Sequence, residues 1–235
     1  MYNSVEMALA TLHRVFRSAN AQKGLIALYS ASNSECRRNG RLGMEVGMAR
    51  EKDQVAVISL FLGDSVNHDI SNDLPEDILV FGEKISIKHS SSKVGTKVKV
   101  KWTSENESVE AARASLLSAP DDYYPHLLIT YLDASRNLIT IIGISSEHNR
   151  NTIRSLGESA FHVPGGNSRG IEYSPSAMKE LLRVREFTVE IHTSLDMILC
   201  PIERRVQMLR DMGVEVDLEP SSQQDSQAVA ARHSQ

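Results

Sequence analysis

The stretch from Asp77 to Lys88 constrains the fold most, because its pattern is that of a β-hairpin with one apolar face. Apolar and polar residues alternate on both sides of Gly82-Glu83, which is typical of two short strands joined by a tight turn. Glycine at the first central position favours a type II′ turn. The resulting register pairs Val80 with Ile85 and Asp77 with Lys88. Because side chains alternate across a strand, a carboxylate and an ammonium then share the polar face of the hairpin.

A cross-strand pair of this kind does not define a site by itself, since it contributes only roughly 0.2–1 kcal/mol in ordinary sheets. Its surroundings are more informative. Residues 84–101 hold six lysines and no acid, in a chain of net charge −4. Positive charge gathered beside a carboxylate–lysine pair indicates phosphate chemistry, in which lysines hold an anionic backbone and the carboxylate holds a metal.

The composition is that of an ordinary soluble globular protein. A chain of 235 residues with 41% apolar and 24% charged residues can bury one real core. Its apolar runs are too short to span a membrane, and the start lacks the pattern of a signal peptide. Cys36 and Cys200 match no zinc spacing and form no disulfide framework. We therefore expect a cytoplasmic protein with no membrane association and no small-molecule cofactor.

The order of predicted elements indicates an α/β core. Periodicity and punctuation predict helices at 4–17, 42–62, 105–118, 146–156, 174–185 and 202–212, and strands at 97–102, 126–132, 138–144 and 186–193. We expect Gly63 to end the second helix and Ser104 to cap the third. With the hairpin, residues 42–132 run helix, strand, strand, strand, helix, strand. This order predicts a mixed β-sheet flanked by helices, with the strand after the helix parallel to the first strand of the hairpin.

The helix at 42–62 carries an acid on its predicted inward seam. The seam has 4-3-4-3-4 spacing and consists of Met44, Met48, Glu51, Val55, Ile58 and Leu62. Glu51 has two interpretations: it lies at the edge of the seam and bends out to water, or it points into a site. Glu45 lies near the same stripe and is a secondary candidate.

Asp77 and Lys88 across a hairpin, in this strand order, resemble the PD-(D/E)XK nuclease superfamily. Pro75-Glu76-Asp77 resembles its first motif and Ser86-Ile87-Lys88 its second. With the Lys101-Trp-Thr that follows, residues 76–88 are similar to type II restriction endonucleases, most specifically the ThaI-like group. The resemblance covers about residues 42–145. It implies a restriction-endonuclease-like fold and an enzyme of a restriction-modification system that hydrolyses double-stranded DNA at specific sites, with Mg²⁺ as cofactor and 5′ phosphates as products.

The resemblance also assigns roles, with one departure. Asp77 and Lys88 are the expected catalytic pair, and Asp77 also binds metal. The family's second metal acid would stand at Ser86, which is a catalytic candidate as a hydrogen-bond donor to a metal-bound water, with a small neutral strand residue as the alternative. Because Mg²⁺ is usually held through carboxylates, an active enzyme would need another acid in its place, as some family members have. The candidates are Glu51 on the preceding helix and Glu105 at the start of the helix after the third strand.

Contacts to DNA are expected outside this centre. Four lysines are candidates for phosphate contacts, with a solvated strand face as the alternative: Lys93, Lys97, Lys99 and Lys101. In the Gly-rich loop 165–170, Asn167 suits adenine and Arg169 suits guanine, with a simple turn as the alternative. Recognition of a palindrome would require a homodimer, since the DNA is two-fold symmetric.

We expect one nuclease domain over residues 1–218, with the catalytic core at about 42–145 and DNA-recognition additions at about 146–218. The end, 219–235, is polar and rich in Ser and Gln, which predicts disorder. Two other functions fit the same fold. One is a structure-selective nuclease of the resolvase or repair type. The other is a catalytically inactive DNA-binding protein, which Ser86 motivates.

Overall fold

The computed structural model describes residues 4–40, 44–70, 74–102, 107–163 and 170–193, together with Arg210 and Gly213. The α-helices in these ranges are α1 (Ser4–Arg17), α2 (Ala19–Arg38), α3 (Met44–Leu62), α4 (Val109–Ser118), α5 (Ser146–Leu156) and α6 (Pro175–Arg183). Short 3₁₀ turns are η1 (Gly63–Ser65), η2 (Asp121–Tyr123) and η3 (Gly157–Ala160). Within these residues, no helix is long and apolar enough to cross a membrane. The predicted helix at 202–212 and the predicted disorder at 219–235 lie outside the described residues.

The strands form two sheets. They are β1 (Val66–Asn67), β2 (Ile78–Val80), β3 (Glu83–Ser90), β4 (Lys99–Trp102), β5 (His126–Asp133), β6 (Leu138–Ile144), β7 (Phe161–His162), β8 (Gly170–Tyr173) and β9 (Phe187–His192). The larger sheet has the order β1-β2-β3-β5-β6-β9. In it β3 and β5 are parallel and the other neighbours are antiparallel. The predicted mixed sheet flanked by helices is therefore confirmed.

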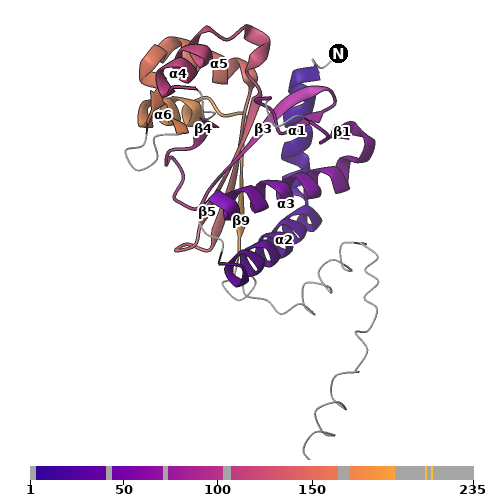
Figure 1. Ribbon diagram of the computed structural model, residues 1–235. Coiled ribbons are helices and arrows are strands. Elements are labelled where there is room, and N and C mark those ends of the chain that lie inside the picture. The colour runs from indigo at the N-terminus through magenta and orange to yellow at the C-terminus, as the bar shows by residue number, and fades with distance from the viewer. Residues whose placement is uncertain are drawn as a thin grey trace, which may run out of the picture.

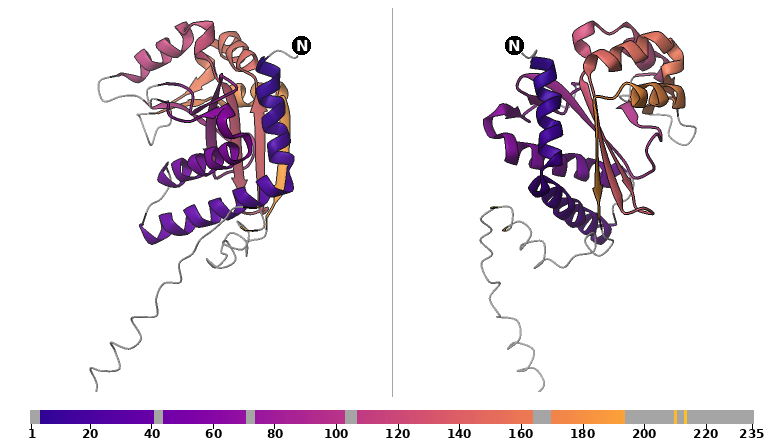
Figure 2. Two further views of the ribbon diagram at one scale, coloured as in Figure 1. Left: turned by 90° about the vertical axis from the view of Figure 1, so that its right-hand side faces the viewer. Right: turned by 180° about the vertical axis from the view of Figure 1, so that it is seen from behind.

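Helices cover the larger sheet on both sides. Figures 1 and 2 show α1, α2 and α3 on one side and α4, α5 and α6 on the other. Neighbouring residues of β5 face the two layers in turn: Leu128 packs in the core with α1–α3, and Leu127 and Ile129 pack in the core with α4–α6. Because both faces of β5 and β6 are buried, their sequences are continuous apolar runs. In β3, by contrast, Ile85 and Ile87 join the first core, and Ser86 and Lys88 occupy the opposite face.

The hairpin exists, but its predicted register is wrong by two residues. Val80 pairs with Glu83 and Ile78 with Ile85, so the turn consists of Phe81-Gly82 and Asp77 approaches Ser86 rather than Lys88. Phe81 and Gly82 both have positive φ, 53° and 83°, as in the type I′ turn, whose twist matches that of the strands. A shift of two residues keeps every side chain on its predicted face. Asp77 and Lys88 therefore still share the polar face.

Two further predictions about the core need correction. The strand after α4, β5, runs parallel to β3, the second strand of the hairpin, and not to the first. β2 has its remaining neighbour in β1, which was not predicted. The predicted third strand, β4, follows in the expected chain order but pairs with β8 in a small three-stranded sheet of order β4-β8-β7.

The starts of two helices show how capping sets the boundaries. α4 begins at Val109, and its cap is Ser108, whose hydroxyl accepts a hydrogen bond from the Ala111 N–H, rather than the predicted Ser104. Gly63 follows α3 with φ of 51°, the left-handed conformation that glycine adopts most easily, as predicted for the end of this helix.

Gly143 provides a stability test, because it lies opposite Phe187 in the β6–β9 ladder. A Cβ atom added at Gly143 would lie 2.1 Å from a ring carbon of Phe187. We predict that Gly143→Ala lowers the free energy of unfolding by about 1–3 kcal/mol, the range for overpacking a filled core. Urea unfolding followed by circular dichroism measures it. Gly47→Ala in α3 is the matched control: its Cβ would meet nothing within 4 Å, and we expect stabilisation of about 0.5–1 kcal/mol.

Candidate active site

The candidate site lies along the edge of β3 that extends beyond β2. The ladder between the two strands ends at Ile85, to whose carbonyl the Asp77 N–H donates at 2.9 Å. Past that point the Asp77 carboxylate takes the place of a strand. Its Oδ2 accepts hydrogen bonds from the Ile87 N–H at 2.6 Å and from the Ser86 hydroxyl at 3.2 Å. Asp77 is therefore fixed directly before β2 by its own backbone and by two donors on β3.

Lys88 lies beside this carboxylate, on the face of β3 that carries Ser86. Its Nζ is 3.6 Å from Asp77 Oδ2, and the two side chains are 19% and 37% exposed. The pair is thus an ion pair at the edge of solvent rather than a buried one. An anionic substrate arriving from solvent can reach both side chains.

Glu51 reaches the same edge from α3. Its carboxylate accepts a hydrogen bond from the His89 N–H, two residues along β3 from the N–H that Asp77 binds. Burial raises the pKa of Glu51 to about 7. The negative charge of Asp77 also raises this pKa, whereas Lys88 and the His89 hydrogen bond lower it. Glu51 therefore lies partly buried beside Asp77 and Lys88, and its role in a site stays a prediction.

The predicted seam of α3 is only partly right. Met48 was expected to face inward but is 50% exposed, whereas Arg50 and Gln54 are buried. Polar side chains can face inward here because α2 and the end of β3 offer them hydrogen-bond partners. The burial of Arg50 and Gln54 was not predicted from the sequence. The available signal was a pair of polar residues one turn apart, on either side of Glu51 in the chain. The secondary candidate Glu45 lies exposed at the start of α3.

Three of the proposed contacts lie outside the described residues: Glu105, Asn167 and Arg169. The four lysines divide into two pairs. Lys93 and Lys97 are exposed in the segment between β3 and β4. On the small sheet, Lys99 is paired with Glu172 at 3.5 Å and Lys101 with Glu107 at 2.8 Å. The second pair therefore already has anionic partners within the protein.

The oxygen atoms at this edge fit a hard divalent cation, although the described residues supply only two carboxylates. Two carboxylates, Asp77 and Glu51, face one open strand edge, and oxygen ligands of this kind are the ones that Mg²⁺ takes. No group of three or more His, Cys, Asp or Glu side chains with the spacing for a metal occurs among the described residues.

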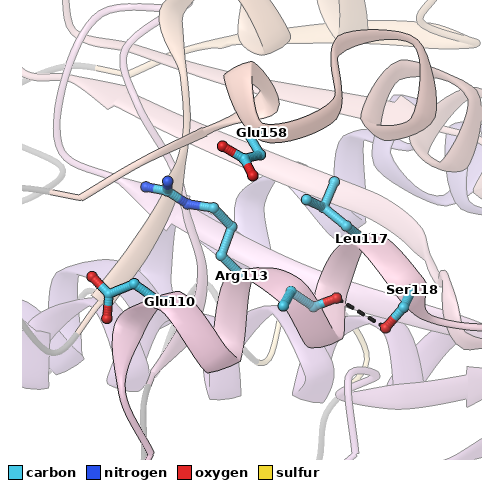
Figure 3. A pocket seen from close by; sticks show the side chains of 6 residues that line it. Glu110, Arg113, Leu117, Ser118 and Glu158 are labelled. Carbon is cyan, nitrogen blue, oxygen red and sulfur yellow. Dashed lines mark hydrogen bonds between the residues drawn. The ribbon is translucent and has the colours of Figure 1, made fainter.

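A separate hollow on α4 and η3, shown in Figure 3, contains Arg113 between Glu110 and Glu158 and shares no residue with the candidate site.

The raised pKa of Glu51 predicts how stability depends on pH. A carboxyl group whose pKa is higher in the folded state stabilises that state below its unfolded pKa of about 4.5, and the contribution is lost as pH rises through about 7. We expect Glu51→Gln, which is neutral at every pH, to be more stable than the original protein at pH 8 without metal, by on the order of 2–3 kcal/mol. At pH 5 the difference should fall to under about 1 kcal/mol. Thermal melts across this range, in EDTA, provide the measurement.

An equal effect of Glu51→Gln at pH 5 and pH 8 would contradict this assignment of the pKa. Glu45→Gln is the matched control, because the same change is made on an exposed side chain of the same helix. We expect this control to show no comparable pH dependence.

Comparison with known proteins identifies the family of the chain. A solved restriction endonuclease in complex with substrate DNA superposes with a TM-score of 0.63 and 25% sequence identity, covering 86% of this chain and 99% of that chain. No curated protein sequence matches. The family model of restriction endonuclease ThaI matches residues 14–198, most of the chain. The chain therefore belongs to the ThaI restriction endonuclease family and is a site-specific endonuclease.

Proposed function

We propose that this endonuclease hydrolyses double-stranded DNA in a Mg²⁺-dependent reaction that leaves 5′ phosphates. The observation that carries the proposal is the meeting of Asp77, Glu51 and Lys88 at one open strand edge. The similar solved enzyme, which is bound to substrate DNA, supports the choice of substrate. The family supports its place in a restriction-modification system, whose DNA substrate is met in the cytoplasm.

Asp77 and Glu51 would hold the cation. Their carboxylates accept from the N–H groups of Ile87 and His89, so both face the same edge of β3. In a β-strand the N–H and C=O of one residue point to the same side, so the Ile87 carbonyl also faces this edge and would be a third oxygen ligand of the proposed site. When bound, Mg²⁺ would polarise a phosphoryl oxygen and lower the pKa of water.

Lys88 would act on the phosphate and on the attacking water. Its ammonium can donate to a non-bridging oxygen and so offset the charge that develops on the phosphoryl group. It can also orient the water for in-line attack on phosphorus. The P–O3′ bond then breaks, giving a 5′ phosphate and a 3′ hydroxyl. Ser86 would keep Asp77 in place through the hydrogen bond at 3.2 Å.

Contacts to the DNA backbone would come first from Lys93 and Lys97, which are exposed close to the end of β3. Lys99 and Lys101 would have to exchange their partners Glu172 and Glu107 for phosphates. Glu105 as a further metal ligand, and Asn167 and Arg169 as contacts to base edges, stay predictions. A palindromic recognition site would also call for two copies of the chain.

The first test is cleavage of long unmethylated duplex DNA in Mg²⁺ and in EDTA. We expect discrete bands in Mg²⁺ and intact DNA in EDTA, because the two carboxylates need a cation to act on a phosphate. Ligation of the products without prior phosphorylation checks for 5′ phosphates. A smear would favour a structure-selective or nonspecific nuclease. Binding without cleavage in either condition would favour the inactive DNA-binding alternative.

Lys88→Ala tests the catalytic centre. We expect the single-turnover cleavage rate to fall by about 10²- to 10⁴-fold, the contribution typical of a positioned acid or base, with DNA binding in EDTA little changed. Lys84→Ala is the matched control, because Lys84 lies on the same face of β3 but donates to the Asp122 carbonyl on the surface. If Lys88→Ala and Lys84→Ala cut DNA equally well, the assignment of Lys88 is wrong.

A further inference from the structure

Arg50 and Gln54 are buried polar residues one turn apart on α3, and Glu51 lies between them in the chain. Arg50 is only 6% exposed. Its Nε and Nη2 donate to Asn33 Oδ1 at 3.0 and 2.7 Å, and its Nη1 donates to the Ser91 hydroxyl at 2.7 Å. One guanidinium therefore joins α3 both to α2 and to the residue that directly follows β3.

Gln54 forms a second connection on the same face of the helix. Its Oε1 accepts from the Tyr29 hydroxyl at 3.3 Å and from the Thr130 hydroxyl at 2.9 Å. These partners lie on α2 and β5. The Tyr29 ring also meets the ring of His89 edge to face, with 5.5 Å between centroids. Polar contacts thus surround the stretch of β3 whose N–H group binds Glu51.

Packing of apolar groups fixes the other half of α3. Among residues 45–62 of this helix, the buried apolar ones are Val57 and Ile58, about two turns after Glu51, and Met48 on the near side is half exposed. Apolar contacts are tolerant of small sliding movements, whereas a two-point guanidinium contact is directional. Glu51 lies in the first half of α3, which the hydrogen bonds of Arg50 and Gln54 attach to the neighbouring elements. The position of Glu51 against β3 therefore depends on these hydrogen bonds.

Stability alone does not explain a buried arginine at this place. Removing a guanidinium from water costs free energy that its hydrogen bonds only partly return, and apolar replacements of similar volume are often as stable. Arg50 also lies close enough to the carboxyl group of Asp53 and to the ring of His89 for its positive charge to lower the pKa of each. Its directional contacts are therefore the feature that an apolar side chain could not supply.

We propose that Arg50 is a positioning residue: by binding Asn33 and Ser91, it holds α3 so that Glu51 stays on the His89 N–H at the metal-binding edge of β3. The inference rests on the proposed function of Glu51. Outer partners of metal ligands typically change metal affinity or activity by about 10- to 100-fold when they are removed. Arg50 touches neither metal nor substrate in this proposal and acts through Glu51.

The test compares Arg50→Met, Asn33→Ala, Glu51→Gln and the double variant Arg50→Met/Glu51→Gln in the full chain. Single-turnover DNA cleavage is measured against Mg²⁺ concentration, and DNA binding is measured in EDTA. We expect Arg50→Met to lower the rate and to raise the Mg²⁺ concentration for half-maximal rate, each by about 10- to 100-fold, with DNA binding unchanged. Asn33→Ala should change the rate and the Mg²⁺ concentration for half-maximal rate in the same directions, but by smaller factors than Arg50→Met. Lys52→Met is the control, since it removes an exposed cation from the same helix.

The double variant separates positioning from a general structural effect. If Arg50 acts through Glu51, Arg50→Met adds no further loss once Glu51 is Gln, so the two effects are not additive. Fully additive losses would overturn the proposal, as would wild-type rate and Mg²⁺ dependence in Arg50→Met. Should Arg50→Met fail to fold, Asn33→Ala decides: unchanged cleavage and Mg²⁺ dependence would overturn the proposal. If Glu51→Gln itself cleaves like the wild type, the proposed role of Glu51 fails and this inference with it. An impaired Glu51→Gln beside unaffected Arg50 and Asn33 variants removes this inference alone.

Discussion

The difference in length between β2 and β3 is the constraint on which the candidate site depends. β2 has three residues and β3 has eight, so the backbone of β3 continues past its partner. A backbone N–H near a protein interior must find an acceptor. Here the Ile87 and His89 N–H groups find carboxylates rather than another strand. Since alternate residues of a strand point the same way at about 6.6 Å spacing, the open edge itself sets the direction and approximate spacing of Asp77 and Glu51.

This arrangement places like charges close together, and the surroundings only partly offset them. Lys88 lowers the pKa of Glu51, but burial and Asp77 outweigh it and raise that pKa to about 7. A site that favours a neutral Glu51 in the absence of a cation is one that a divalent cation would stabilise in its charged form, since binding requires the deprotonated acid. The repulsion between the two carboxylates destabilises the protein at this one edge. Two apolar cores, one on each side of the sheet, hold the rest of the fold.

Sequence patterns predicted the parts of the fold that depend on periodicity. The long apolar runs of β5 and β6, the helix that ends before Gly63, and the two faces of the hairpin follow from local rules. The hairpin register did not, because the choice between Gly82-Glu83 and Phe81-Gly82 depends on whether Phe81 accepts a positive φ. Similarly, the alternating lysines of β4 predicted a strand but not its partner β8, about 70 residues further along the chain. The burial of Arg50 was not predicted, because the polar pair Arg50 and Gln54 shows in the sequence but the partners that allow Arg50 to be buried, Asn33 and Ser91, lie far away in the chain.

Ser86 shows why moving an acid from strand to helix is physically reasonable. Its side chain is buried and donates to Asp77, on the same face as Lys88. An acid at this position would put a carboxylate against Oδ2 of Asp77, where the serine now supplies a donor. Asp77 would lose a hydrogen bond and gain a repulsive neighbour, which only the cation could relieve. With serine, Asp77 is held by neutral donors on β3, and the second carboxylate arrives from α3, on the next N–H of the same edge. Under the proposed function the position of that helix is part of the site, so the buried contacts of Arg50 and Gln54 would bear on chemistry that they do not touch.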